Sequence, residues 1–253
     1  MAQSGSALEW GSSGRWFESS RPDHGNNGKE PSGSFLHFRG VILFSKAAEM
    51  TVLLNRLFPG QSQAVLKAMA EVQREVFVDP GWRRLAYTDR SLPIGHGQTI
   101  SKPATVLRML SAMEPVFGGK LLETGSGSGY LASVASRLFS RVYCVERVLG
   151  LVESSRTNLQ KTGARNAVVR YGDGSAGWAD NAPFDGILYS AGAPGLPASL
   201  ADQLREGGLA GVPVGSKTSQ EFTVWKKVEG DLVRVTSFAC SFVPLIGKEG
   251  WNG

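Results

Sequence analysis

Histidine and cysteine are scarce in this sequence, which limits the chemistry that it can carry. Its 253 residues include three histidines, two of them (His24 and His37) near the N-terminus, and two cysteines. Zinc sites and serine–histidine triads therefore have almost nothing to build on. Cys144 and Cys240 both lie in apolar, strand-like runs. They predict buried, reduced thiols and a cytoplasmic protein, not a disulfide framework.

Long hydrophobic runs and blocks of basic charge are also missing. The most apolar stretch, FLHFRGVILF, is interrupted by charge, is far shorter than the about 18 residues of a membrane helix, and starts too late for a secretory signal. The net charge is +5, but the basic residues occur singly or in pairs. We expect no membrane and no nucleic acid among the partners, only a mild preference for acidic ones.

The first 49 residues differ from the rest of the chain. Residues 1–34 are rich in Gly, Ser, Asn and Pro without apolar periodicity, which is typical of disorder. Trp16–Ser19 can be encoded by TGG-TTC-GAA-TCC, which contains a T-arm sequence common to tRNA genes. We hypothesise that residues 1–49 are an extension ahead of a true start at Met50, and that residues 50–253 form one domain. A natural flexible tail is the alternative.

The remaining pattern predicts an α/β fold. An amphipathic helix is expected from about Ser62 into REVF, a loop over LPIGHGQTIS, and a helix from Pro103. Near-continuously apolar strands then alternate with helices, which indicates a parallel sheet covered on both faces, and a final hairpin adds antiparallel strands at its C-terminal edge. The expected strands are 120–124, 141–146, 167–173, 184–192, 208–215, 221–228 and 232–239, with helices over 130–139, up to about 161, and 197–205.

A glycine-rich turn, LLETGSGSGY, follows the first strand of this sheet. Gly125, Gly127 and Gly129 let the backbone turn sharply and let a ligand approach closely, although a tight turn without a ligand has the same pattern. Glu146 and Asp173 end the next two strands, at the edge where ligands of open α/β folds bind. Solvated strand-end acids are the alternative for these two.

The charges of this turn favour a cationic ligand. The glycines run G-x-G-x-G and follow Glu123, whereas a pyrophosphate prefers positive potential at a helix N-terminus. S-adenosylmethionine has no phosphate and carries a sulfonium and an ammonium, which Glu123 would favour, while Glu146 can accept both hydroxyls of a ribose. We interpret the turn as an S-adenosylmethionine site. The alternative for Glu123 is a carboxylate bound to nearby backbone amides.

The motifs resemble those of the protein-L-isoaspartate O-methyltransferases, which repair isoaspartyl residues in damaged proteins. RLAYTDRSLPIGHGQTISKP resembles the segment that precedes the cofactor motifs in that family. It is followed in the family's order by LLETGSGSGY, VYCVER, GDG, FDGILYSAGAP, GGLAGVPVG and SFVPLIG. The resemblance covers about residues 62–247. GQTIS is its most specific part, because many methyltransferases share the glycine turn and the acids.

The resemblance implies a Rossmann-like class I S-adenosylmethionine-dependent methyltransferase sheet with a rearranged C-terminal strand order and additional N-terminal helices. It implies Ser101 as the catalytic residue and cofactor contacts at Ser101, Glu123, Gly125, Gly127, Glu146, Asp173 and Gly174. The departures from the family pattern are Thr124, Tyr189-Ser190 and TDRS. They bear on substrate preference more than on the cofactor.

The chemistry of this reaction needs alignment and no general base. An isoaspartyl α-carboxylate, with a reference pKa near 3.5, is already ionised at neutral pH. Thr99 and Ser101 can donate hydrogen bonds that orient it, with Thr99 on the substrate side. Ser101 could instead cap the helix that begins at Pro103. His96 and Gln98 have no assigned role, since solvent exposure, substrate contact and support of the loop all fit them.

Three functions compete at this stage. The first is repair methylation of isoaspartyl proteins and peptides by a monomer. The second is methylation of another carboxylate, in a modified peptide or a small metabolite. The third is a non-catalytic cofactor- or protein-binding module, against which the intact GQTIS and the strand-end acids argue. A nucleic-acid methyltransferase is not favoured, because no motif for an extruded base is present.

Overall fold

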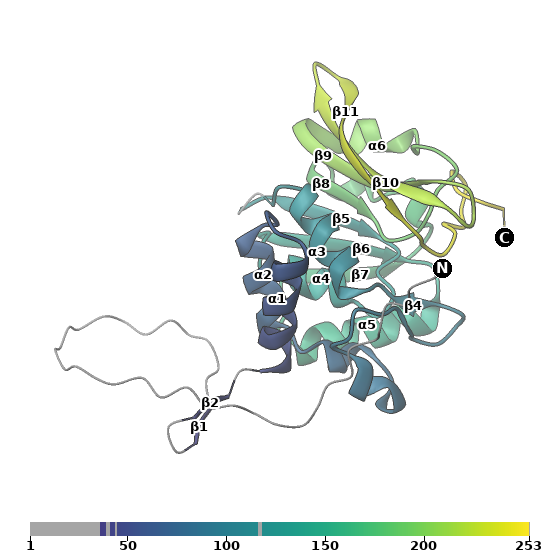
Figure 1. Ribbon diagram of the computed structural model, residues 1–253. Helices are drawn as coiled ribbons and strands as arrows, with labels where there is room; N and C mark the ends of the chain where they lie inside the picture. Colours follow the sequence, from purple (N-terminus) through teal and green to yellow (C-terminus); the bar gives the residue numbers. More distant parts are fainter. Residues whose placement is uncertain (1–35, 39–40, 44, 116–117, 253) are drawn as a thin grey trace, which may run out of the picture. The chain divides into compact units, whose positions relative to one another are not determined.

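The computed structural model describes residues 36–38, 41–43, 45–115 and 118–252 (Figure 1). Its centre is a seven-stranded sheet. The strands of this sheet are β5 (Lys120–Thr124), β6 (Arg141–Glu146), β7 (Ala167–Tyr171), β8 (Phe184–Tyr189), β9 (Leu204–Gly215), β10 (Gln220–Val228) and β11 (Asp231–Cys240). The α-helices are α1 (Lys46–Leu57), α2 (Gln63–Glu71), α3 (Pro103–Ala112), α4 (Tyr130–Ala135), α5 (Leu149–Lys161) and α6 (Ser199–Gln203).

The sheet has the order β11-β10-β9-β8-β5-β6-β7. The strands from β9 to β7 are parallel, whereas β10 pairs antiparallel with both β9 and β11. The expected parallel sheet with antiparallel strands at its C-terminal edge is therefore confirmed. The order reverses between β8 and β5, and the strands on both sides of this point end at the same edge. Ligands of open α/β sheets bind at such a switch point.

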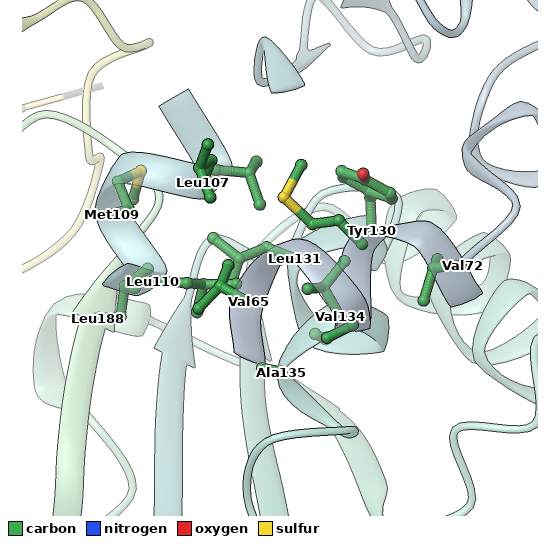
Figure 2. Packing of buried hydrophobic residues seen from close by; sticks show 14 of the residues in the cluster. Val65, Val72, Leu107, Met109, Leu110, Tyr130, Leu131, Val134, Ala135 and Leu188 are labelled. Atoms are coloured by element: carbon green, nitrogen blue, oxygen red, sulfur yellow. The ribbon is translucent and has the colours of Figure 1, made fainter. Parts of the chain in front are cut away.

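Apolar side chains on the two faces of the sheet form two cores. Along β5, Leu121 belongs to a core with residues of α1 to α5, while its neighbour Leu122 belongs to a second core with residues of α6 and Leu245. This alternation follows from the period of two in a strand. Figure 2 shows the first core, where Val65 of α2, Leu107 of α3 and Leu131 of α4 lie together. The cores fix the sheet, and polar loops occupy the edge at which its parallel strands end.

The segment before α3 contains more regular structure than the sequence indicates. The helix expected to run into REVF ends at Glu71, and Arg74–Phe77 forms a separate 3-10 turn, η1; a second, η2, spans Pro80–Leu85. The expected loop over LPIGHGQTIS is a small hairpin instead, in which β3 (Leu92–Pro93) pairs antiparallel with β4 (Thr99–Ile100). The hairpin matters for function because it holds the polar residues of GQTIS in one place.

Smaller differences concern where elements begin and end. The helices expected over 130–139 and 197–205 are shorter, and β9 begins at Leu204, four residues before the strand predicted there. The 3-10 turns η3 (Gly174–Ala176) and η4 (Ala179–Asn181) follow β7. A two-stranded ladder, β1 (Leu36–Phe38) with β2 (Val41–Leu43), precedes α1. Within the described residues, no helix has the length and apolarity to cross a membrane.

The domain boundary that we expect at Met50 lies inside a helix. α1 begins at Lys46, and the hydroxyl of Ser45 accepts a hydrogen bond from the backbone N–H of Ala48. Ala47 and Met50 are both buried. Residues 1–35, on which most of the proposed extension falls, lie outside the described residues, so the boundary stays a prediction.

Candidate functional site

Three cavities adjoin at the carboxyl edge of the parallel strands. The Glu146 cavity (about 180 Å³) is lined by residues of the glycine turn, the end of β6 and the segment 243–246. The Glu123 cavity (about 40 Å³) is lined by Glu123, residues of the glycine turn and the start of α4, and the Arg108 cavity (about 740 Å³) is lined by residues of α3 and the end of β11. Thr99 and Ser190 line all three cavities. Ligands in neighbouring cavities would therefore meet at these two residues.

Glu123, the last-but-one residue of β5, is 1% exposed and lines the smallest cavity. Its Oε1 accepts a hydrogen bond from the Ser190 hydroxyl at 2.9 Å, and the Cys144 thiol lies 3.9 Å from its Oε2. Burial, helped by the nearby charge of Glu146 and opposed by the hydrogen bond from Ser190, raises the pKa of Glu123 to about 8. Glu123 is therefore not held as a carboxylate by backbone amides alone. It is prepared for a cation.

The glycine turn brings its backbone into both small cavities. Gly127 has a φ of 54°, a left-handed conformation that side chains rarely adopt, and a Cβ there would lie 3.1 Å from the Ile94 side chain of the β3–β4 hairpin. The turn and the hairpin thus pack against each other. Ser126 Oγ in this turn is buried, and no described residue hydrogen-bonds with it, although the residue lines the Glu123 cavity. A ligand group can use this hydroxyl.

Glu146, at the end of β6, is bound very differently from Glu123. One carboxylate oxygen accepts the N–H of Gly127 at 2.9 Å, and the other accepts the N–H of Val148 at 2.9 Å. The side chain is 4% exposed and lines the cavity that carries its name. Each carboxylate oxygen has a further lone pair, so this fixed carboxylate can accept two hydroxyl donors from a ligand.

Of the pair Asp173 and Gly174 at the end of β7, only Gly174 lines one of the three cavities. Gly174 is buried and lines the Glu146 cavity. The Asp173 carboxylate accepts hydrogen bonds from the backbone and hydroxyl of Ser175 and from the backbone N–H of Lys248. Burial opposes its ionisation, but these donors outweigh burial and lower the pKa of Asp173. Asp173 thus ties down the C-terminal segment, part of which forms a wall of the Glu146 cavity.

The β3–β4 hairpin supplies the residues predicted to face the substrate. Thr99 lines all three cavities, and Ser101 lines the Glu123 and Arg108 cavities. The capping role considered for Ser101 is not what the structure shows. Lys102 is the N-cap residue of α3, without a side-chain hydrogen bond, and the Asp89 carboxylate accepts the N–H of Ala104 at 2.9 Å. The hydroxyl of Ser101 is therefore not used to begin the helix.

His96 and Gln98 belong to the hairpin turn itself. His96 is exposed with a φ of 53°, and a Cβ at Gly150 would collide with its imidazole, so it lies over the start of α5. The Gln98 side-chain amide donates to the backbone oxygen of His96 at 3.3 Å, and Gln98 lines the Glu146 cavity. This hydrogen bond supports a role for Gln98 in holding the loop, which was one of the roles left open for it.

Two parts of the site do not stand out in the sequence. Ser190, which differs from the residues common at this place in the family, lines all three cavities and donates a hydrogen bond to Glu123. Segment 243–246 forms a wall by folding back from the end of the sheet, where Gly192 N–H donates to Val243 O and Leu245 N–H to Gly192 O. The motif SFVPLIG, which contains this segment, points to a functional role only because it resembles a motif of the family named above. In the described residues, no cluster of three His, Cys, Asp or Glu side chains could hold a metal ion.

Taken together, the two small cavities suit one elongated ligand. A cation fits beside Glu123, a carboxylate can meet the Ser126 hydroxyl of the glycine turn, and a pair of hydroxyls fits Glu146. The large Arg108 cavity has room for a second molecule. It meets the first two at Thr99 and Ser190, so a group could pass there from one ligand to the other.

Known proteins are similar to this chain over most of its length. The sequence profile of the family described as Protein-L-isoaspartate(D-aspartate) O-methyltransferase (PCMT) matches residues 48–250. A protein-L-isoaspartate O-methyltransferase of Pelodictyon phaeoclathratiforme is 43% identical over 212 residues, which cover 83% of this chain and 96% of that protein. One of Aeropyrum pernix is 46% identical over 196 residues, which cover 76% of this chain and 75% of that protein.

Solved structures agree with the sequence relatives. A protein-L-isoaspartate O-methyltransferase matches the fold with a TM-score of 0.71 at 27% identity, over 79% of this chain and 66% of that one. A Plasmodium falciparum protein solved in complex with S-adenosyl-L-homocysteine has a TM-score of 0.68 at 24% identity, over 79% of this chain and 98% of that one, and this likeness concerns the fold alone. The expected class of sheet is confirmed, and the chain belongs to the protein-L-isoaspartate O-methyltransferase family.

Proposed function

We propose that this protein transfers a methyl group from S-adenosyl-L-methionine to the α-carboxylate of L-isoaspartyl residues in damaged proteins and peptides. The observation that carries the proposal is the wall formed by Thr99 and Ser101 of GQTIS. It separates a large cavity, with room for a peptide, from the small cavities with the two buried carboxylates. Family membership gives the reaction, and this wall supports the proposal that the reaction takes place beside Thr99 and Ser101.

The small cavities fit the cofactor. Glu123 and Ser190 would hold its ammonium end, the Ser126 hydroxyl its carboxylate, and Glu146 the two ribose hydroxyls. Gly125 and Gly127 would let the cofactor approach the backbone of the turn closely. When bound, the cofactor supplies a methyl group on a sulfonium. Gly174 and the segment 243–246 would pack along its nucleoside part, since they line the Glu146 cavity. Asp173 then acts through the C-terminal segment, without direct contact.

The residues of the hairpin would prepare the acceptor. A carboxylate with a reference pKa near 3.5 needs no base at neutral pH, so the work of the site is to hold it in line and to exclude water. The Ser101 hydroxyl would donate to one carboxylate oxygen from the wall of the Arg108 cavity, and Thr99 would do so beside it. The hairpin lies over the glycine turn through Ile94 and Gly127, which covers the transfer site.

One assay tests this function against the two other candidates. Purified protein is incubated with radiolabelled cofactor and a peptide that contains one isoaspartyl residue, with the matched aspartyl peptide as control. We expect methyl transfer to the isoaspartyl peptide alone. Transfer to neither peptide, together with measurable cofactor binding, would favour a different carboxylate acceptor or a binding module, and transfer to both would exclude an isoaspartyl-specific site.

We also propose that the enzyme domain begins near Met50 and works as a monomer in the cytoplasm. Both cysteines are free thiols, Cys144 buried and Cys240 half-buried, which fits a reducing compartment. Light scattering on the purified protein measures the oligomeric state directly. A dimer at micromolar concentration would refute the monomer.

A further inference from the structure

Arg74, in the 3-10 turn η1, is a charged residue with no exposed surface. Its guanidinium donates three hydrogen bonds to backbone oxygens: Nε to Ala86 at 2.7 Å, Nη2 to Ser101 at 2.7 Å, and Nη2 to Arg90 at 3.5 Å. None of the ion pairs between described residues includes Arg74. A fully buried guanidinium without a carboxylate partner is costly, so its contacts need an explanation.

The three carbonyl groups belong to one stretch of chain. Ala86 and Ser101 stand at its two ends, and the β3–β4 hairpin lies between them. One planar guanidinium thus connects the backbone before the hairpin, at Ala86, with the backbone after it, at Ser101. A lysine ammonium, with one compact donor centre, could not serve the same three oxygens with this geometry.

Arg74 also connects this loop to the glycine turn. Its guanidinium lies over the ring of Tyr130, at 4.6 Å from the centroid, and Tyr130 is the first residue of α4, directly after Gly129. Tyr130 and Ser101 both line the Glu123 cavity, whereas Arg74 lines none of the three cavities. Arg74 therefore contacts the backbone of Ser101 without lining any of the three cavities.

We propose that Arg74 is a positioning residue for methyl transfer, which fixes the backbone of Ser101 and thereby directs the hydroxyls of Thr99 and Ser101 toward the transfer site. The proposal rests on the proposed function. Neighbouring contacts act in the same direction, because Glu75 of the same turn accepts a hydrogen bond from the Tyr87 hydroxyl. At the start of the stretch 86–101, Arg74 contacts Ala86 and Glu75 contacts Tyr87. At its end, Arg74 alone contacts Ser101.

The test compares three variants with the wild type. Arg74→Lys keeps the charge and Arg74→Gln keeps a donor, but neither can reach all three carbonyl groups. Arg137→Gln is the matched control, since Arg137 is a half-buried arginine that donates to the backbone oxygen of Thr162 at 2.6 Å, away from the three cavities. For each protein we would measure kcat and KM for an isoaspartyl peptide, affinity for S-adenosyl-L-homocysteine by calorimetry, and the thermal unfolding midpoint.

We expect kcat of both Arg74 variants to fall about 10- to 100-fold, the order of loss that follows from misplacing a reacting group by about 1 Å. Affinity for S-adenosyl-L-homocysteine should stay at the wild-type value, and Arg74→Lys should be the less impaired of the two. Arg137→Gln should lose stability without loss of kcat. If kcat of the Arg74 variants instead stays near wild type, or if neither variant yields folded protein that binds S-adenosyl-L-homocysteine, Arg74 serves the fold alone and the proposal fails.

A second measurement keeps this test independent of turnover. Hydrogen exchange reports the amides of the hairpin, such as Ile94 N–H, which donates to Gln98 O. Exchange across residues 92–101 should accelerate in Arg74→Lys and remain unchanged in Arg137→Gln. If the wild type methylates no isoaspartyl peptide, the proposed function fails, but unequal exchange in the two variants still supports positioning by Arg74, and equal exchange overturns it.

Discussion

At the scale of single residues, two buried carboxylates at neighbouring strand ends are held in opposite ways. Glu146 receives two backbone N–H groups, whereas Glu123 receives one hydroxyl and lies near one thiol. Backbone amides stabilise a carboxylate more than these weak side-chain donors do, and burial disfavours the charge on Glu123. Glu146 is thus a fixed acceptor, and Glu123 gains its charge when a cation arrives.

Cofactor binding should therefore release a proton from Glu123. The pKa of about 8 in the ligand-free protein leaves this group mostly protonated at pH 7, and a ligand ammonium beside it would lower the pKa. Calorimetry with S-adenosyl-L-homocysteine at pH 7, in two buffers of different ionisation enthalpy, should show release of about one proton. The release should disappear in Glu123→Gln. Identical heats in the two buffers would show that Glu123 is ionised beforehand.

The same pKa sets a pH dependence of stability. The folded-state pKa of Glu123 lies above the ordinary value of 4.5, so the ligand-free protein binds more protons folded than unfolded between these values. Its stability from this group is complete below about pH 4.5 and is lost as pH rises toward 8. Glu123→Gln should remove this loss, which urea unfolding at pH 6 and pH 8 would measure.

Ser101→Ala separates chemistry from stability. We expect methyl transfer to fall by roughly 100-fold, the order seen when one donor that orients a reacting group is removed. The thermal midpoint should barely change, because Asp89, and not Ser101, accepts the N–H of Ala104 at the start of α3. Normal activity with a lowered midpoint would show instead that Ser101 is structural.

A residue of the site can be predicted from the sequence when its position follows from the end of a strand. It cannot be predicted when contacts with residues distant in the sequence place it. Glu123 and Glu146 line the cavities because the carboxyl ends of parallel strands share an edge. Asp173 obeys the same rule, yet its carboxylate faces Ser175 and Lys248, whose place depends on how the end of the chain folds back. Arg74 could not be found, since a charged residue in an amphipathic run suggests a solvated face.

At the scale of elements, the periodicity of apolar residues predicts burial better than conformation. Val65, Met69, Val72 and Phe77 are all buried, as a helix through REVF would require. However, Val72 adopts an extended backbone (φ −104°, ψ 119°), so α2 ends one residue earlier and η1 starts afresh. The hairpin of β3 and β4 was predicted as a loop because its two-residue strands are too short to show alternation.

The C-terminal segment is an element whose position depends on one glycine. A Cβ at Gly247 would collide with the Asp173 carboxylate and the Ser175 hydroxyl, which together bind the N–H groups of Lys248 and Glu249. Gly247→Ala should release the segment and weaken affinity for S-adenosyl-L-homocysteine roughly tenfold or more, since a hydrogen bond to a charged group contributes about 1.5–3 kcal/mol.

Hydrogen exchange and calorimetry would measure this effect. Gly81→Ala is the control, because a Cβ there meets nothing within 4 Å. Faster exchange over residues 243–251 should accompany the weaker binding. Undiminished affinity in Gly247→Ala would mean that the segment 243–246 does not form a wall for the cofactor.

At the scale of the whole molecule, the parallel direction of the central strands followed from the alternation of strands and helices, but the order of the strands and the start of the domain did not. A chain that begins at Met50 lacks the Ser45 cap of α1 and the buried Ala47. We expect proteins that begin at Ser45 or at Met50 to retain activity. The second should unfold a few degrees lower, since a cap is worth about 1 kcal/mol and that corresponds to about 2–4 °C in a domain of this size.

N-terminal sequencing of the native protein complements these truncations. A first residue at Met50 would agree with the proposed extension, and a mature terminus before Arg15 would exclude it. Loss of activity in both truncated proteins would show that the segment before Ser45 contributes to the enzyme.

The meeting of the three cavities at Thr99 and Ser190 has a consequence for redesign. The Arg108 cavity shares only Thr99, Ser101, Ser190, Val243 and Pro244 with the two small cavities. Its other walls, including Arg108 on α3 and Lys217 before β10, can be exchanged without touching a residue that lines the small cavities. A library of variants confined to those walls would change which methyl acceptor binds, while the residues proposed to bind the methyl donor stay unchanged.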